Sequence, residues 1–230
     1  MARDRRHRGQ RAPGGAQGRL HDRGPHEPFR TAGPDPVSSG PVVVPAGLVV
    51  LVGPPASGKT AFVRELIAQG RLDPEAVVSS DGIREEFFGS GAPDATSDAA
   101  DARVFEERDR RITARLAAGR TTVAESTNVT PRARARLMAV AGRSGAPVAV
   151  LRFPQDEAVL LGQNEERERN DVSAEDVMAC AAVMRRYADE ARLRAEGAAF
   201  VCDVPGRGQG TTPAEAARRF TFRRAWDAPG

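Results

Sequence analysis

The 230-residue chain has few histidines and cysteines, two residue types that catalysis and metal binding commonly use. Its three histidines, His7, His21 and His26, all lie near the N-terminus, so a catalytic base elsewhere in the chain must be a carboxylate. Cys180 and Cys202 are the only cysteines, and their spacing matches neither a CxxC motif nor a zinc site. We therefore expect two incidental reduced thiols in a cytoplasmic protein.

Long apolar runs are also missing. No run reaches the length needed to cross a membrane, and the charged N-terminus is not followed by the apolar segment of a signal peptide. We expect no membrane association. With 40% hydrophobic residues the chain can still bury one core, and its length suggests one or two domains.

Residues 1–46 are rich in arginine, glycine and proline and contain almost no large apolar side chains. Such a composition buries too little surface to offset chain entropy, so we expect a disordered basic tail. The tail has a net charge of +4 in a chain whose total is +3, which leaves −1 for the remainder. The basic character therefore belongs to the tail. A tail of this kind either contacts nucleic acid or anionic surfaces or is only a solvated extension.

Lysine is nearly absent, because Lys59 is the only lysine among 34 basic residues. It lies in residues 53–60, GPPASGKT, which match the pattern G-x-x-x-x-G-K-[ST]. A short apolar run at 48–52 precedes the motif, and apolar residues at helical spacing follow it. This order of strand, glycine loop and helix predicts a phosphate-binding loop. The alternative is a glycine-rich turn that only precedes a helix, and the position of the lone lysine argues against it.

Each residue type in this loop has a physical reason. Gly53 and Gly58 allow backbone N–H groups to point at an anion, and the helix N-terminus adds donors and a positive dipole end. Lys59 can reach the outer phosphates, and the Thr60 hydroxyl can ligate Mg²⁺. The residues expected to bind the nucleotide phosphates are Gly53, Pro54, Pro55, Ala56, Ser57, Gly58, Lys59 and Thr60.

Four further strands are expected, at 76–80, 121–124, 148–153 and 198–204, and helices alternate with them. The alternation predicts an α/β fold in which a parallel sheet lies between helix layers and ligands bind at the carboxyl ends of the strands. We place this domain at residues 47–204. Residues 205–230 are interpreted as a basic C-terminal extension, whose short helix from Pro213 would dock through Phe220, Phe222 and Trp226.

Two residues follow the second predicted strand at the expected ligand edge. Asp81 is either a base that accepts a proton from an attacking hydroxyl or the N-cap of the next helix. Arg84 lies one helical turn further on, where it could hold a phosphate or carboxylate of an acceptor.

Acidic and basic candidates also occur later in the chain. Glu125 ends the third strand and could support Mg²⁺ through water, whereas Thr127 and Asn128 after it could equally form a turn and cap. Arg167 and Arg169 belong either to a lid over the phosphates or to a solvated helix face.

Four segments taken in order, GPPASGKT, SSDGIR, ESTNVTPRARARL and NEERERNDVSAEDV, resemble the P-loop kinases related to phage-type polynucleotide 5′-hydroxyl kinase. The resemblance covers residues 47–204 and is strongest to small bacterial kinase modules described as AAA-type ATP-binding proteins. It implies the P-loop NTPase kinase fold, with five parallel strands in the order 2-3-1-4-5 sandwiched by helices. ATP and Mg²⁺ are the implied cofactors.

The resemblance also implies roles for single residues. Asp81 corresponds to the general base, Arg84 to the contact with the acceptor's phosphate, and the lid arginines Arg167 and Arg169 to ligands of the donor phosphates. The chain departs from the family pattern in having Glu125 where Asp is common. It also has Gln163 where an arginine often enters the lid, and an extra lid residue around 170–171.

The resemblance favours transfer of the γ-phosphate of ATP to a polynucleotide 5′-hydroxyl. A small-molecule kinase acting on a sugar, nucleoside or antibiotic is the first alternative, and the near-neutral charge of the domain favours it. A non-catalytic ATP-binding switch is the second alternative, favoured by Gln163.

Overall fold

The computed structural model describes residues 40–89, 97–167 and 172–225. All of them belong to one compact unit of the chain. Four predicted features lie outside these ranges: the tail up to residue 39, Arg169, the extra lid residue around 170–171, and Trp226. Within the described part of the chain, no helix is long and apolar enough to cross a membrane.

The main sheet has five parallel strands in the order β3-β4-β2-β5-β6. The strands are β2 (Leu48–Val52), β3 (Val77–Ser79), β4 (Thr122–Glu125), β5 (Val148–Arg152) and β6 (Phe200–Asp203). Numbered as predicted, this is the order 2-3-1-4-5. The predicted α/β P-loop kinase fold is therefore confirmed.

Eight α-helices accompany the strands in the described ranges. They are α1 (Lys59–Ala68), α2 (Ser80–Phe88), α3 (Asp98–Ala117), α4 (Pro131–Arg143), α5 (Glu157–Glu165), α6 (Ala174–Tyr187), α7 (Glu190–Ala195) and α8 (Pro213–Arg219). Six of them begin after a Ser, Thr or Asp whose side chain accepts a backbone N–H. Such caps satisfy donors that the first helical turn leaves free, so the local sequence determines where these helices start.

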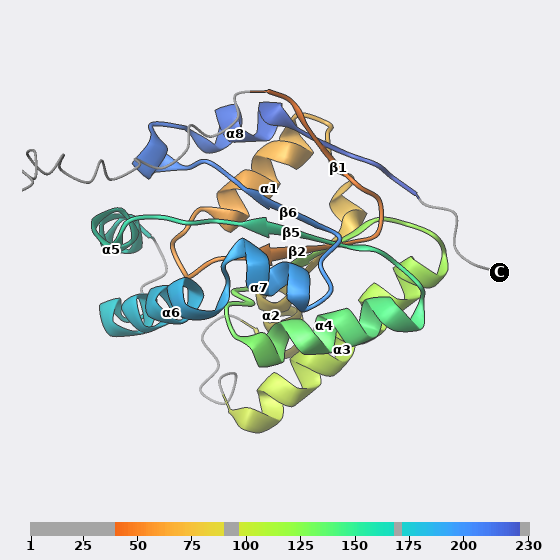
Figure 1. Ribbon diagram of the computed structural model, residues 1–230. Coiled ribbons are helices and arrows are strands. Elements are labelled where there is room, and N and C mark those ends of the chain that lie inside the picture. The colour runs from red at the N-terminus through yellow and green to blue at the C-terminus, as the bar shows by residue number, and fades with distance from the viewer. Residues whose placement is uncertain (1–39, 90–96, 168–171, 226–230) are drawn as a thin grey trace, which may run out of the picture. The chain divides into compact units, whose positions relative to one another are not determined.

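The central strand β2 is buried on both faces, as a parallel sheet requires. Leu48, Val50 and Val52 pack in one hydrophobic cluster with α2, α3, α4, α6 and α7. Val49 and Leu51 pack in the other cluster, with α1 and α8. Figure 1 shows α1 and α8 on one face of the sheet and α3 and α4 on the opposite face. The carboxyl ends of all five strands therefore lie along one edge between these layers.

A second, two-stranded sheet extends the domain beyond residues 47–204. β1 (Val42–Val44) pairs in parallel with β7 (Phe220–Phe222), with Val42 opposite Phe220. Val44 and Phe220 are fully buried, and the Phe220 ring packs edge-on against Phe62 of α1 at 5.2 Å. Residues 42–44 therefore belong to the folded domain rather than to the predicted tail. The 205–230 segment likewise contributes α8 and β7 to the core, because its apolar residues cover the α1 face.

The β1–β7 pair predicts where an N-terminal truncation becomes harmful. Removal of residues 1–39 is expected to leave the melting temperature unchanged, because their composition offers almost no apolar surface. Removal of residues 1–46 also deletes Val44, and losing one fully buried valine costs about 2 kcal/mol. The melting temperature should then fall by about 4–8 °C in a calorimetric scan. Equal melting temperatures for the two truncations would contradict the packing of β1.

Candidate active site

The loop between β2 and α1 has the backbone conformation that anion binding requires. Ala56 and Gly58 have φ angles of 61° and 90°, and this left-handed backbone turns successive N–H groups inward. A Cβ atom on Gly53 would lie 2.6 Å from the Ser57 Oγ, so no larger residue fits there. Gly58 is thus required by its left-handed backbone, and Gly53 by the close approach of the Ser57 side chain.

Lys59 is the buried cation of this loop, with 9% of its surface exposed. Its Nζ donates to the carbonyl oxygens of Gly53 at 2.8 Å and Pro54 at 2.7 Å. Burial lowers the pKa of Lys59 from 10.5 to about 8, while the negative charges of Glu125 and Asp81 oppose this shift. The amino group is therefore held inside the loop, within electrostatic range of two carboxylates.

Thr60 and Glu125 form a hydroxyl–carboxylate pair beside the loop. The Thr60 Oγ1 donates to Glu125 Oε1 at 2.7 Å, and Glu125 is 9% exposed at the end of β4. Mg²⁺ in nucleotide sites uses one or two protein oxygens and takes further ligands from phosphates and water. This pair fits such an ion. The side chain of Glu125, longer than the Asp that is common at this position in the resembled family, reaches the hydroxyl of Thr60. The described residues contain no group of three or more His, Cys, Asp or Glu side chains that could hold a metal ion.

Asp81 is not the cap of α2, so the capping interpretation is wrong. Ser79 is the N-cap, and its Oγ accepts a hydrogen bond from Gly82 N at 3.3 Å. Asp81 lies in the first turn with an exposed side chain, and its charge acts on Lys59. Ser79 also pairs in register with Glu125 across β3 and β4. Asp81 therefore lies two residues after the end of β3, and that strand end is the neighbour of Glu125, which is hydrogen-bonded to Thr60.

Carboxylates engage Arg84, which was expected near an acceptor, and also Arg136 of α4. Arg84 Nη2 forms an ion pair with Asp101 of α3 at 2.6 Å. Arg136 forms an ion pair with Asp109 of the same helix. Both cations therefore carry a neutralising partner on the described surface.

Arg167 differs from these arginines. Its Nη1 is buried and has no hydrogen-bond partner among the described residues, and its positive charge contributes to lowering the Lys59 pKa. A buried guanidinium nitrogen without a partner costs free energy unless a ligand accepts its hydrogen bond. Arg167 thus lies near the loop as predicted, and Arg169 falls outside the described residues.

A narrow cleft adjoins the last residues of the loop, and sequence reasoning missed it. It is lined by Ser57 and Gly58 of the loop, by Gln163 of α5, and by Gly206 and its neighbours after β6. The Nε2 of Gln163 is buried with no hydrogen-bond partner in the described ranges. The glycine-rich run after β6 was the available signal, since a Cβ on Gly206 would meet the Gln155 side chain at 1.7 Å.

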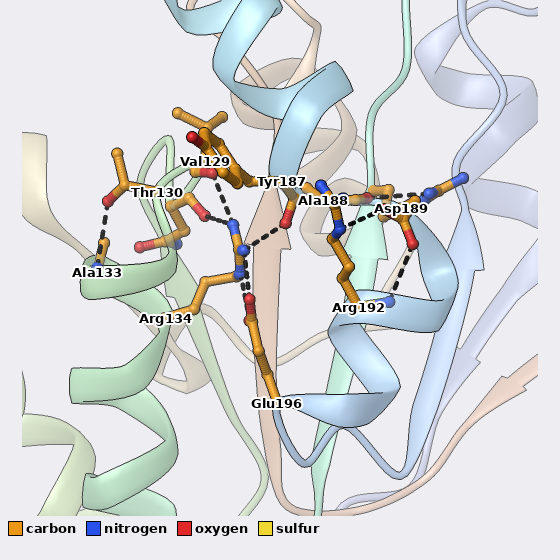
Figure 2. A network of polar contacts seen from close by, with 11 residues as sticks. Val129, Thr130, Ala133, Arg134, Tyr187, Ala188, Asp189, Arg192 and Glu196 are labelled. Atoms are coloured by element: carbon orange, nitrogen blue, oxygen red, sulfur yellow. Dashed lines mark hydrogen bonds and ion pairs between the residues drawn. The ribbon is translucent and has the colours of Figure 1, made fainter.

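A second feature missed from the sequence is the network of polar contacts around Arg134 (Figure 2). The Arg134 side chain is fully buried. Its guanidinium donates to the Val129 oxygen at 2.7 Å, to the Tyr187 oxygen at 2.7 Å and to both carboxylate oxygens of Glu196. Arg134 therefore fixes the segment after β4 against the end of α6 and against α7.

This segment in turn supports the phosphate loop. The Gly53 N–H donates to the Thr127 oxygen at 3.0 Å, and the Asn128 side chain donates to the Leu51 oxygen at 2.9 Å. Asn128 has a φ of 47°, a left-handed conformation that asparagine tolerates better than most residues. Thr127 and Asn128 are therefore structural supports of the loop.

The lowered pKa of Lys59 predicts proton uptake when ATP binds at alkaline pH. Near pH 8.5 the amine of the free protein is largely neutral, because its pKa is about 8. Phosphate oxygens favour the charged amine, so binding should raise the pKa and take up a fraction of a proton, and affinity should fall as pH rises through 8. Calorimetry in two buffers of different ionisation enthalpy measures this uptake. Equal uptake at about pH 7, where the amine is already charged, would contradict the assignment to Lys59.

The loop, the strand order and the strand-end residues together define a P-loop kinase domain. The family described as "AAA domain" matches residues 48–190, and the chain belongs to it. No curated protein matches this chain.

Solved structures share the fold at low identity. One chain of the Pnkp1/Rnl/Hen1 RNA repair complex matches with a TM-score of 0.53 and 19% identity over 61% of this chain and 44% of that chain. A sugar kinase from Janibacter sp. HTCC2649 matches with a TM-score of 0.51 and 18% identity, covering 76% and 92% of the two chains. A gluconokinase from Sinorhizobium meliloti 1021 matches with a TM-score of 0.50 and 17% identity, covering 75% and 88%. The present chain spans less than half of the RNA repair chain, and similarity at this level establishes the fold alone.

Proposed function

We propose that this chain is a kinase that transfers the γ-phosphate of ATP to a hydroxyl group. One observation carries the proposal: the single lysine is buried in a phosphate loop, within electrostatic range of Glu125, Asp81 and Arg167. Phosphoryl transfer asks a protein mainly for positioning and charge stabilisation. Around one loop, Lys59 and Arg167 supply positive charge, and Glu125 and Asp81 supply negative charge.

The proposed roles follow from this arrangement. Lys59 and the loop N–H groups hold the β- and γ-phosphates. Arg167 offers a phosphate oxygen the N–H of Nη1, which has no partner among the described residues. Asp81 accepts the proton of the acceptor hydroxyl as the new oxygen–phosphorus bond forms. The bond from the γ-phosphorus to the bridging oxygen breaks, and ADP leaves with that electron pair.

Thr60 and Glu125 would hold Mg²⁺, directly or through water. The ion, when bound, would neutralise charge on the β- and γ-phosphates. Glu125 also accepts the Thr60 hydrogen bond, which orients the hydroxyl oxygen.

Two acceptor classes remain candidates, each favoured by a different observation. The motif resemblance favours a polynucleotide 5′-hydroxyl, for which Arg84 would grip the adjacent phosphate. The ion pairs of Arg84 with Asp101 and of Arg136 with Asp109 favour a small-molecule acceptor. A strand of phosphates needs cations that are not already neutralised, so these two ion pairs support the small acceptor better.

The salt dependence of transfer distinguishes the two acceptors. Phosphorylation of a 5′-hydroxyl oligonucleotide should decline steeply with salt, with a logarithmic slope of about 0.7 for each phosphate contact on a single strand. Transfer to a small neutral acceptor should change little over the same salt range. We expect transfer to a small acceptor and no labelled oligonucleotide. A labelled oligonucleotide whose yield drops with salt would reverse this assignment.

Gln163 favours a further possibility, an ATP-binding switch without turnover. The residue places a neutral amide in the cleft, at a position where the kinases that the motifs resemble often have an arginine. ATP binding by calorimetry without ATP consumption, across all acceptors tested, would support the switch and rule out the kinase.

A further inference from the structure

A second cavity, of about 200 Å³, adjoins the first residues of the phosphate loop. It is lined by Pro54 of the loop, by Pro154 after β5, and by Ala181 and Met184 of α6. The narrow cleft described above touches the last residues of the same loop, Ser57 and Gly58, so the two hollows adjoin different ends of it.

This position suits an acceptor rather than the nucleoside. The helix end of the loop holds the inner phosphates, and Lys59 reaches the outer ones. Its Nζ is bonded to the oxygen of Pro54, which lines the cavity. Attacking and leaving oxygens lie roughly in line during phosphoryl transfer, so the acceptor must approach from the side away from ADP. The Lys59 amino group also donates to Ser57 Oγ at 3.3 Å, but its two shorter hydrogen bonds, at 2.8 and 2.7 Å, are to Gly53 and Pro54 at the cavity end of the loop.

The charged groups of the cavity wall are neutralised within the protein. Arg152 forms a two-pronged ion pair with Asp203 at 2.5 and 2.7 Å. Arg185 pairs with Glu157 at 2.7 Å. The third charged residue of the wall is Asp189, which pairs with Arg192 at 3.2 Å.

The rest of the wall is apolar except for one amide. Pro54, Pro154, Ala181, Met184 and Ala188 contribute hydrocarbon surface, and Gln155 contributes donors and acceptors. A wall without net charge gives an anionic ligand no compensation for the water it loses. A neutral molecule with both C–H surface and hydroxyls matches such a wall.

We propose that this cavity binds a small neutral polyol or sugar-like ring, one hydroxyl of which receives the phosphate. The inference rests on the proposed kinase function and specifies its acceptor. A cavity of about 150 Å³ admits benzene, so 200 Å³ accommodates a six-membered ring with a few substituents. The ring's C–H face packs on Met184 and the prolines, while Gln155 and Arg185 bind its hydroxyls. The acceptor oxygen gains the phosphoryl group, ADP leaves, and the proton passes to Asp81.

The test uses the full-length chain with ATP and Mg²⁺ and a panel of probes. The neutral probes are glucose, xylose, ribose and myo-inositol, and the charged probes are gluconate and a 5′-hydroxyl oligonucleotide. Phosphate transfer is measured for each probe, and ATP binding is measured separately by calorimetry. We expect transfer to at least one neutral probe.

A matched pair of variants on α6 tests the location. Ala181 is buried and lines the cavity, whereas the adjacent Ala182 is exposed. Ala181→Leu should raise the KM for the neutral acceptor by about tenfold or more, because a few methylenes in a pocket discriminate on that scale. The KM for ATP should not change, and Ala182→Leu should leave both constants unchanged. If Ala181→Leu lowers the melting temperature, Ala181→Val can replace it. This variant adds less volume and should raise the KM for the neutral acceptor by a smaller factor.

The outcomes separate the two proposals. Transfer only to gluconate or the oligonucleotide, no transfer to any neutral probe by a chain that binds ATP, or an unchanged acceptor KM in both Ala181 variants overturns the cavity assignment. Failure of the unmodified chain to bind ATP would instead reject the kinase function itself.

Discussion

Replacing Lys59 by alanine is expected to abolish ATP-dependent turnover, lowering the rate by at least about a hundredfold. The residue is the only lysine of the chain, and its amino group is bound to two carbonyl oxygens inside the loop. Lys59→Arg should fail as well, because a guanidinium is larger than an ammonium and cannot take its place in a site only 9% exposed. Turnover assays and ATP calorimetry measure both variants.

Arg64 provides the control for this experiment, because it is an exposed cation on the same helix. Arg64→Ala removes the same formal charge and should retain the rate and the affinity of the unmodified chain. ATP binding of normal affinity by Lys59→Ala would disprove the assignment of the phosphate loop.

Asp81→Asn is expected to lower the rate by about 10²- to 10⁴-fold without lowering stability. The substitution removes the proton acceptor while keeping the size of the side chain. Stability should hold because Ser79, and not Asp81, caps α2. The rate constant of a single-turnover assay and the melting temperature measure the two parts of this expectation.

Asp98→Asn is the matched control, since Asp98 also lies in the exposed first turn of a helix whose cap is a preceding serine. This variant should keep the full rate. An Asp81→Asn protein that retained most of its activity would mean that another group takes the acceptor's proton.

The main sheet could be predicted from sequence because each strand is a short apolar run between helical segments. The strand order came from the resemblance to P-loop kinases and is confirmed by the structure. The β1–β7 pair could not be predicted in this way. Its two strands have three residues each, come from opposite ends of the chain, and pair in parallel, so no local pattern connects them.

The site was predictable where chemistry is carried by a fixed spacing, as in Lys59 and Thr60. It was less so where several residues compete for one role. Ser79, Ser80 and Asp81 are all good capping residues, and only the register of β3 against β4 decides which of them begins the helix. The ion pair of Arg84 involves Asp101, 17 positions away on another helix, so the neutralisation of that cation became visible only in three dimensions.

The β1–β7 pair also bears on how the protein is made. Val42–Val44 are synthesised before the five strands of the main sheet, whereas Phe220–Phe222 follow the last of those strands. Until then the apolar face of α1 lacks the Phe220 ring that covers Phe62. Pairings between distant segments form slowly, and incompletely covered apolar surface favours aggregation. A nascent chain that stalls before residue 213 would therefore contain the nucleotide loop but lack α8 and β7. The hydrophobic cluster on the α1 face of the sheet would then be incomplete.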